Sequence, residues 1–357
     1  MKIIYSFNKK GYENECWARE IRAASTEEYS FIPFNHQDYL DPVFYRDALS
    51  LDSLYRAKDV RLMKLYKALE ECIYRHSADA IIVANGPPYH PDFLKRLGVY
   101  KALYSADDPG ATYLINIPYL HAYDHVFYVA PAYSAEMDMA EKMRYARMTN
   151  VDWLPIAVFD FECDPARPAE TVLQQVRDID VIYIGGFWRQ KVETLVQVKR
   201  AFGRKFKLYG FFRWKHNVYL NVRYGLGSWI RPVSHQERVR LYQRSKIGFN
   251  IHWDSYGLGN QRLYHLPANG VMQISDCAPF LGEIFQAGQE MVTYSSTDEL
   301  IDQIRYYLAN DGERAVIAAR GYHRTMRDYR FTTVTRQAGR LIKAGMKRAS
   351  QTNEKCL

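Results

Sequence analysis

A glycine pair near mid-chain is the feature of the sequence with the clearest chemical use. The run 181–184 is β-branched and aromatic, Gly185 and Gly186 follow it, and a helical pattern begins at once. Such a turn can bind phosphate, because glycines let the backbone approach, N–H groups point outward and the helix dipole favours an anion. Arg189 and Lys191 follow directly and can neutralise phosphate charge. A tight turn that only joins a strand to a helix is the alternative interpretation.

A second group of polar residues follows the predicted strand 247–252. His252 ends this strand, and Asn260 and Arg262 stand at the start of the next predicted helix, 261–268. In open parallel sheets, ligands bind beyond the carboxyl ends of the strands. An arginine at a helix start on that edge is therefore a candidate for binding a phosphate or a nucleotide; the alternative is an ordinary surface arginine.

His265 lies one helical turn after Arg262, on the same face of the predicted helix. It could reach a ribose hydroxyl, or it could be a histidine satisfied inside an interface. The other donor-side candidates are Phe187, which follows the glycine pair, and Tyr209, which lies in the predicted strand 206–210.

The first half of the chain offers a candidate base. Asp107 and Asp108 follow the predicted strand 100–105, again at the edge where ligands bind. An aspartate there could be the general base for a hydroxyl nucleophile, and Asp107 is the first choice. The alternative is an Asx-type turn in which Pro109 breaks the chain.

Three further residues are candidates for the acceptor side. Asn85 and His90 follow the predicted strand 80–84, and Gly11 opens the loop after strand 2–7. His90 could touch a substrate, although a loop histidine can also be simply solvated.

The string Asp178-Ile179-Asp180 matches the D-x-D pattern of metal-dependent sugar transferases. It precedes the strand 181–185, so it falls at the opposite edge of the sheet from the other candidates. The five cysteines are scattered and form no C-x-x-C pair, which predicts neither a zinc site nor a disulfide framework.

Strands that alternate with amphipathic helices predict parallel sheets with helices on both faces. The predicted strands are 2–7, 31–34, 80–84, 100–105, 126–130, 151–157, 181–185, 206–210, 247–252 and 271–275. The Pro- and acid-rich stretch 159–170 is predicted to be a linker. We therefore expect an α/β domain over 1–160, a second over 171–335, and a helix and tail over 336–357 that packs back on the first domain.

Bulk composition is that of a globular protein with an anionic partner. The 357 residues carry a net charge of +8, and 48% apolar with 25% charged residues exclude a disordered chain. The charge fits an anionic ligand, an anionic membrane face or nucleic acid. Because no apolar run suffices for a signal peptide or a membrane span, we expect a cytoplasmic protein.

The stretch 211–231 mixes cationic with aromatic side chains. Such a mixture can stack on bases and contact phosphates, settle on anionic lipid head groups, or form an ordinary connection. The residues are Arg213, Trp214, Lys215, Tyr219, Arg223, Tyr224, Trp229 and Arg231.

The order of motifs in the second half resembles the nucleotide-binding domain of GT-B glycosyltransferases, most closely their spore-maturation CgeB-like branch. The strings that carry the likeness are VIYIGGFWRQK, LYGFFRW, IGFNIHW, GNQRLYHLPANGVMQISDCAPF and GEIFQAGQEMVTYSSTDELIDQIRYYLAND. In the first half, YSADDPGATY resembles the D-D-P loop of that branch, and VDWLPIAVFDFECDP resembles its interdomain segment.

The resemblance implies two Rossmann-like domains facing across a cleft, with C-terminal helices. It also implies a UDP-, GDP- or dTDP-sugar donor held by the C-terminal domain, with no bound cofactor or metal. Gly185, Gly186, Arg189 and Arg262 would face the diphosphate. At the position of His265 the wider family usually has an acidic residue that accepts both ribose hydroxyls, whereas a neutral histidine accepts one hydrogen bond.

We therefore predict a glycosyltransferase. Asp107 or Asp108 takes the proton of the acceptor hydroxyl as it attacks the anomeric carbon, while the glycine turn, Arg189 and Arg262 stabilise the departing nucleoside diphosphate. The acceptor is left open among a glycan, a lipid-linked sugar and a small molecule, as are peripheral membrane association and the oligomeric state.

Two alternative functions remain at this stage. The VIYIGGF pattern, the R-x-x-H string and Asp107 also resemble phage DNA β-glucosyltransferases, whose acceptor is a hydroxymethylated base in DNA. A catalytically degenerate GT-B fold that serves as a binding or structural module is the other alternative, and His265 favours it.

Overall fold

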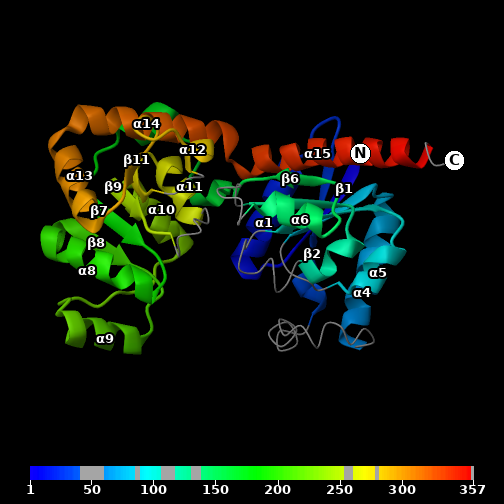
Figure 1. Cartoon of the computed structure of the whole chain (residues 1–357), viewed down its shortest axis with the longest axis horizontal. Helices are drawn as coiled ribbons and strands as arrows, with labels where there is room; N and C mark the ends of the chain where they lie inside the picture. The colour runs from blue at the N-terminus through cyan, green and yellow to red at the C-terminus, as the bar shows by residue number, and fades with distance from the viewer. Residues whose placement is uncertain are drawn as a thin grey trace. The chain divides into compact units, whose positions relative to one another are not determined.

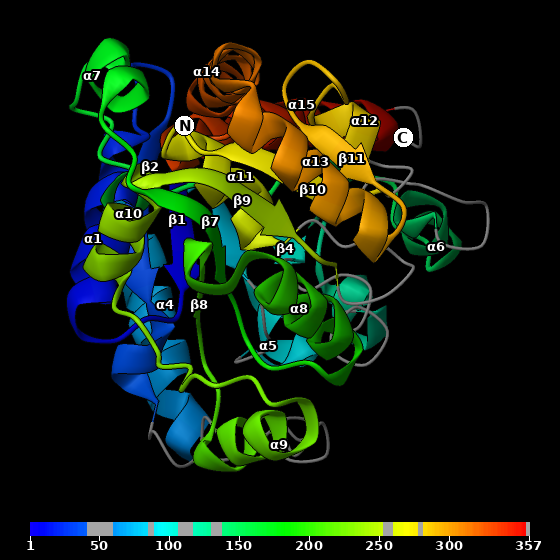
Figure 2. The same cartoon turned by 90° about the vertical axis from the view of Figure 1, so that its left-hand side faces the viewer.

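The computed structural model describes residues 1–40, 60–84, 89–105, 117–129, 138–252, 260–277 and 281–354. The chain divides into two compact units: unit 1 contains Met1–Pro155 and Phe331–Leu357, and unit 2 contains Ile156–Arg330. Each unit is built on its own parallel sheet with helices around it (Figure 1 and Figure 2). The predicted α/β class, with two parallel-sheet domains and C-terminal helices, is confirmed.

Unit 1 holds a six-stranded sheet in the order β2-β1-β3-β4-β5-β6, and every neighbouring pair is parallel. The central strand β3 is a continuous apolar run, because the strands of a parallel sheet are covered on both faces. All five residues of β3 are buried. The strands are β1 (Lys2–Phe7), β2 (Ser30–Asn35), β3 (Ala80–Ala84), β4 (Tyr100–Ser105), β5 (His125–Tyr128) and β6 (Val151–Trp153).

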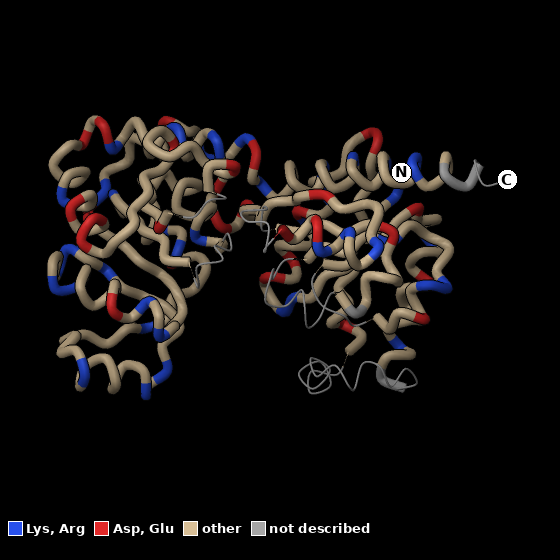
Figure 3. The backbone as a smooth tube through the Cα atoms, in the orientation of Figure 1, with Lys and Arg blue, Asp and Glu red and all other residues tan. Residues whose placement is uncertain are grey.

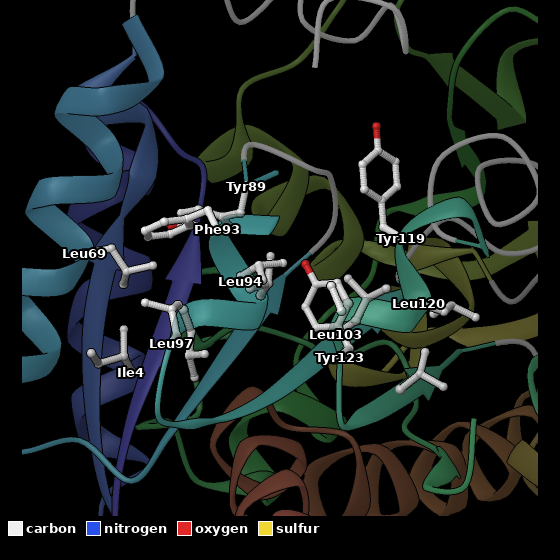
Figure 4. Packing of buried hydrophobic residues seen from close by; sticks show 14 of the residues in the cluster. Ile4, Leu69, Tyr89, Phe93, Leu94, Leu97, Leu103, Tyr119, Leu120 and Tyr123 are labelled. Carbon is white, nitrogen blue, oxygen red and sulfur yellow. The ribbon is translucent and has the colours of Figure 1, made fainter. Parts of the chain in front are cut away.

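Helices cover the two faces of this sheet with different partners. Ile4 of β1 packs in a core with Leu69, Phe93 and Leu103 (Figure 4). Tyr5 points to the opposite face, where its ring lies edge-on to that of Phe331. The helices are α1 (Gly11–Ala23), η1 (His36–Tyr39), α4 (Val60–His76), α5 (Pro91–Arg96), η3 (Ile117–Ala122), α6 (Met139–Tyr145) and α15 (Phe331–Glu354).

The last helix, α15, belongs to unit 1 although it follows unit 2 in the chain. Phe331 packs against the Trp17 ring with centroids 5.6 Å apart. Arg336 Nε donates to Ala24 O at 3.0 Å, and Arg348 Nε donates to Asn150 Oδ1 at 2.9 Å. Aromatic packing and these two arginines thus attach the C-terminal helix to the first sheet.

Unit 2 holds a five-stranded parallel sheet in the order β11-β10-β9-β7-β8. Alternate residues of β7 serve opposite faces: Val181 and Tyr183 pack in one core cluster, Ile182 and Ile184 in another. The strands are β7 (Ile179–Ile184), β8 (Phe206–Tyr209), β9 (Ser245–Asn250), β10 (Met272–Asp276) and β11 (Val292–Tyr294).

Serine caps begin two helices of unit 2, since the Ser234 and Ser296 hydroxyls each accept a hydrogen bond from the N–H three residues on. The helices of unit 2 are η4 (Asp160–Glu162), α7 (Ala169–Gln174), α8 (Arg189–Phe202), η5 (Gly203–Lys205), α9 (Trp214–Tyr224), α10 (His235–Gln243), α11 (Gln261–Ala268), α12 (Leu281–Ile284), α13 (Thr297–Ala309) and α14 (Asp311–Asp328).

Several sequence expectations differ from the structure, among them the strand β11, which was not predicted, and the predicted strand 247–252, which is β9 and ends at Asn250. The stretch 159–170 is part of unit 2, with Phe159, Glu162 and Cys163 buried, instead of an extended linker. The predicted strand 151–157 is only the three-residue β6, because Pro155 cannot donate to a sheet. The stretch 211–231 contains the helix α9, which the sequence analysis did not predict.

Candidate functional site

The carboxyl edge of the unit 2 sheet gathers most of the predicted donor-binding residues. Gly185 follows β7 and its N–H donates to Tyr209 O, the last residue of β8, at 3.0 Å. Arg262, in the first turn of α11, reaches the same place, since its Nε donates to Ile184 O at 2.9 Å. The structure therefore brings Gly185, Tyr209 and Arg262 together.

The guanidinium of Arg262 is held in one orientation by its neighbours. Its Nη1 donates to Asn250 Oδ1 at 3.0 Å, at the end of β9. Its central carbon lies 4.1 Å from the centre of the buried Tyr183 ring, a cation–π distance. Because the guanidinium is already fixed, little conformational entropy is lost when it binds an anion.

Gly185 leaves the space that the guanidinium occupies. A Cβ at this position would lie 2.4 Å from Arg262 Nη2 and 2.8 Å from a carbon of the Tyr183 ring. Gly210, after β8, has a φ of +150°, and a Cβ there would lie 1.6 Å from Gly185 O. Only glycine fits at position 185 or 210. The backbones that follow β7 and β8 can therefore approach each other closely beside the Arg262 guanidinium.

The N-terminus of α8 follows this glycine turn. Its N-cap residue, Trp188, makes no side-chain capping bond, and the Lys191 N–H donates to Trp188 O at 3.0 Å, so the N–H groups of Arg189 and Gln190 are those that the helix start can offer to an anion. Arg189 is exposed at the first helical position. Lys191 is instead buried in unit 2, which makes it a less accessible partner for a phosphate than the sequence suggested.

The buried His252, two residues after β9, pairs with the half-buried Asp276 at the end of β10, on the same edge of the sheet. The Nδ1 of His252 lies 2.5 Å from Asp276 Oδ1, and the His252 backbone N–H donates to Asp276 Oδ2 at 2.7 Å. Burial tends to raise the pKa of Asp276, but these bonds outweigh it and hold that pKa below its usual value. The ionised carboxylate orients the His252 ring.

His265 faces η4 of unit 2. Its Nε2 lies 2.9 Å from Glu162 Oε2, and both side chains are buried. Arg238 donates to the other oxygen of Glu162 at 2.8 Å, the Phe159 N–H donates to Glu162 at 3.1 Å, and Asn269 donates to the Glu162 carbonyl at 3.0 Å. Burial favours the neutral acid, but the partners of the carboxylate lower the pKa of Glu162 to about 2.

Replacing Glu162 with Gln should lower the free energy of unfolding at neutral pH by about 1–3 kcal/mol, because Arg238 and His265 lose a buried anion. The ionised Glu162 stabilises the fold above its ordinary pKa of 4.5, and this contribution is lost as the pH falls toward about 2. The difference between wild type and variant should therefore shrink across that interval. Denaturant titrations at several pH values measure it.

Glu193→Gln, on the exposed face of α8, is the matched control and should leave the free energy of unfolding unchanged. A difference between wild type and Glu162→Gln that stays constant from neutral pH down to pH 2 would show that the carboxylate charge is not what stabilises this cluster.

The remaining candidates have varied surroundings. Phe187 turns toward α9, where its ring stacks on His216 at 4.0 Å between centroids. Asn260 caps α11 by accepting from the Leu263 N–H at 3.2 Å. Gly186 adjoins the turn, and a Cβ there would have Trp188 Nε1 as its nearest neighbour, at 3.5 Å.

In unit 1, Gly11 starts α1 with a φ of +51°, and a Cβ there would face open space. His90 is buried and caps α5 through Nδ1, which accepts from the Asp92 N–H at 3.1 Å. The predicted site residues Asp107, Asp108 and Asn85 lie outside the described residues. The roles predicted for all these site residues stay predictions.

Four residues of this arrangement were missing from the sequence analysis: Glu162, Tyr183, Asn250 and Asp276. Asn250 and Asp276 each end a parallel strand, the signal that had already selected His252. Tyr183 lies within β7 and not after its end, and Glu162 lies in a stretch interpreted as a linker. No pattern in the sequence marks those two.

The D-x-D string is engaged in ion pairs at the start of β7. Asp178 pairs with Arg244, and Asp180 with Lys246, on the amino-terminal side of the sheet. Within the ranges that the structure describes, no group of three or more His, Cys, Asp or Glu side chains is placed to hold a metal ion.

Comparison with known proteins identifies the fold. Residues 189–338, less than half of the chain, match a family model described as glycosyl transferase-like. No curated protein matches the chain in sequence. A solved glycosyltransferase from Rickettsia africae superposes with a TM-score of 0.64 at 12% identity, over 97% of this chain and 98% of that one.

Two further structures cover nearly the whole chain. A sucrose-phosphate synthase from Thermosynechococcus elongatus has a TM-score of 0.61 at 12% identity, over 98% of this chain and 100% of that one. HepE of Anabaena in complex with UDP-glucose has a TM-score of 0.59 at 13% identity, over 96% and 100%. The fold is therefore that of GT-B glycosyltransferases, with two parallel-sheet α/β domains and C-terminal helices.

The described helices include none that combines the length and the apolar character required to cross a membrane.

Proposed function

We propose that this protein is a glycosyltransferase that moves a sugar from a nucleotide-sugar donor to a hydroxyl acceptor. The observation that carries the proposal is the fixed guanidinium of Arg262 beside the Gly185 turn, at the carboxyl edge of the unit 2 sheet. The match of residues 189–338 to a glycosyl transferase-like family supports it. So does the presence of UDP-glucose in a protein of the same fold, HepE.

The chemistry asked of unit 2 is stabilisation of a leaving group. When the bond between the anomeric carbon and the diphosphate breaks, negative charge grows on the phosphate oxygens. Arg262, exposed Arg189 and the uncapped N–H groups of α8 are donors that this charge can meet. The Arg262 guanidinium and the backbone N–H groups of α8 are held in place before the reaction, so they stabilise the charge without reorganising.

The acceptor oxygen forms the new bond as the old one breaks, and its proton must leave. We assign that proton to the Asp107 carboxylate, with Asp108 as the alternative. In this scheme the displacement is direct, and no metal takes part. Assignment to the CgeB-like branch and a cytoplasmic location belong to the same proposal.

Nucleotide binding tests the donor part of this function. A nucleotide at about 100 times its Kd should stabilise the fold by about 2.7 kcal/mol, which corresponds to a rise in Tm of roughly 5–10 °C for a unit of this size. Thermal unfolding with UDP, GDP, dTDP and CMP should give this rise for one nucleotide in preference to the others.

The same panel weighs the non-enzymatic alternative. If none of the four nucleotides raises the Tm of a protein that unfolds cooperatively, the proposed donor site is contradicted and a binding or structural module is favoured. A positive nucleotide is followed by turnover of the corresponding sugar nucleotide, measured as release of free nucleoside diphosphate.

A further inference from the structure

The surface around α9 combines exposed apolar side chains with unopposed positive charge. Between Glu193 and Glu237 the chain contains no acidic residue and nine Lys or Arg residues, of which Arg231 pairs with Glu237. This stretch includes β8, α9 and the segments that flank α9. Figure 3 shows Lys and Arg along α9 without an acidic neighbour on that helix.

One face of α9 is firmly attached to unit 2. Asn217 is fully buried and exchanges two hydrogen bonds with Ile230: its Nδ2 donates to Ile230 O at 3.0 Å, and the Ile230 N–H donates to its Oδ1 at 2.7 Å. Asn221 donates to Ser228 O at 3.1 Å, and Leu220 is buried beside them. These bonds hold the helix and the loop 225–230 as one piece.

The outward face of α9 is apolar, which is the reverse of an ordinary surface helix. Trp214, Val218 and Val222 follow one another at intervals of four residues, so they form one row along the helix. Trp214 is 72% exposed and Val222 is 82% exposed. Phe211 before the helix, at 75%, and Trp229 after it, at 63%, extend the same apolar character into the flanking loops.

Cationic side chains lie next to this row. Lys215 and Arg223 stand eight residues apart on the adjacent row of α9, and Arg213 immediately precedes the helix. All three are exposed. Among the described residues none of them forms an ion pair. We call the set of Phe211, Arg213, Trp214, Lys215, Val218, Val222, Arg223 and Trp229 the α9 face.

We propose that the α9 face binds the surface of an anionic lipid bilayer. Tryptophan and phenylalanine settle at the boundary between head groups and acyl chains, valines enter beside them, and lysines and arginines meet the anionic head groups. A helix with this composition lies in the interface plane without spanning it.

Two other partners fit less well. A nucleic acid would use the cations and the tryptophans, but the exposed Val218 and Val222 have no role in stacking on bases. A second copy of the same face would place Lys215 and Arg223 opposite like charges if the contact were two-fold. A bilayer uses the whole set, and this inference goes beyond the proposed function without depending on it.

Vesicle binding by the full-length protein tests the proposal. Co-sedimentation is measured with vesicles of phosphatidylcholine alone and of phosphatidylcholine mixed with phosphatidylglycerol. We expect binding to the mixed vesicles only, weakened by added salt, with a blue shift of tryptophan fluorescence. Lys215→Glu with Arg223→Glu should weaken binding at least about tenfold, because each cation contributes appreciably near an anionic surface. Trp214→Ser with Val222→Ser should weaken it by roughly tenfold and reduce the blue shift.

The matched control is Val316→Ser with Arg320→Glu, an exposed valine and an exposed arginine on α14. It should bind vesicles as the wild type does, and all variants should keep the wild-type Tm and its response to a nucleotide. Absence of wild-type binding to mixed vesicles would overturn the proposal. Equal losses in the control and the α9 variants, or tighter binding of single-stranded DNA than of vesicles, would overturn it as well.

Discussion

Replacing Asp107 with Asn should abolish sugar transfer while leaving nucleotide binding intact. Asp107 follows the end of β4 by two residues, and β4 is a central strand of the unit 1 sheet. An amide has the shape of the carboxylate but cannot take the proton of an attacking hydroxyl. The loss of a general base costs about 10²–10⁴-fold in rate. We therefore expect kcat to fall by that factor with the donor KM nearly unchanged.

Asp108→Asn is the matched control, since it removes the same charge one residue further on. Release of UDP from UDP-glucose, or from the donor that the thermal panel selects, measures the rate for both variants. Calorimetric titration with the nucleotide measures binding. Full activity of Asp107→Asn would remove Asp107 from the mechanism, and a loss confined to Asp108→Asn would transfer the role to Asp108.

Removing the Arg262 guanidinium should cost about 10²–10³-fold in kcat/KM, because the departing diphosphate loses a preorganised donor. Arg262→Leu should also reduce the rise in Tm that the nucleotide produces. Arg262→Lys keeps the charge but loses the planar guanidinium that donates to both Ile184 O and Asn250 Oδ1. We therefore expect its kcat/KM to lie between those of the wild type and Arg262→Leu.

A substitution of Gly185 tests whether the position of the Arg262 guanidinium, and not only its charge, matters for catalysis. In Gly185→Ala the new methyl would collide with Arg262 Nη2 and with the Tyr183 ring, so the guanidinium must move although no charge is removed. We expect Gly185→Ala to reduce kcat/KM toward the level of Arg262→Leu. Gly186→Ala is the matched control, because a Cβ there would meet nothing closer than Trp188 Nε1 at 3.5 Å.

Steady-state turnover and thermal unfolding of the four variants decide between the two roles. If Gly185→Ala and Gly186→Ala are equally active, the position of the Arg262 guanidinium does not govern catalysis. If Arg262→Leu lowers Tm without changing the response to the nucleotide, Arg262 supports the fold alone.

The parallel strands could be predicted because their signal is local. Ala80–Ala84 and the run 181–184 are apolar without interruption, as strands covered on both faces require, and glycine or polar residues end them. From such strands the edge that binds ligands follows by rule, so Arg262 and His252 could be selected before any coordinates.

The structure of two segments could not be predicted from local patterns, because contacts with residues distant in the sequence determine it. The stretch 159–170 has the proline and acid content of a linker, but Asp160 pairs with Arg330 and Glu162 with Arg238 and His265. Helix α9 buries little more than Asn217 and Leu220. Its apolar row faces outward, so hydrophobic periodicity could not indicate which side is the core.

By itself, the amino-acid sequence determined the α/β class, the two parallel sheets and the glycine turn before α8, since each depends on residues close together in the chain. Only the tertiary structure decided what His265 touches, how Arg262 is held and which face of α9 is exposed. Those outcomes depend on side chains up to about a hundred residues apart, such as Glu162 and His265, whose separation is 103. Nothing in a local pattern encodes such a contact, because it forms only when the whole unit folds.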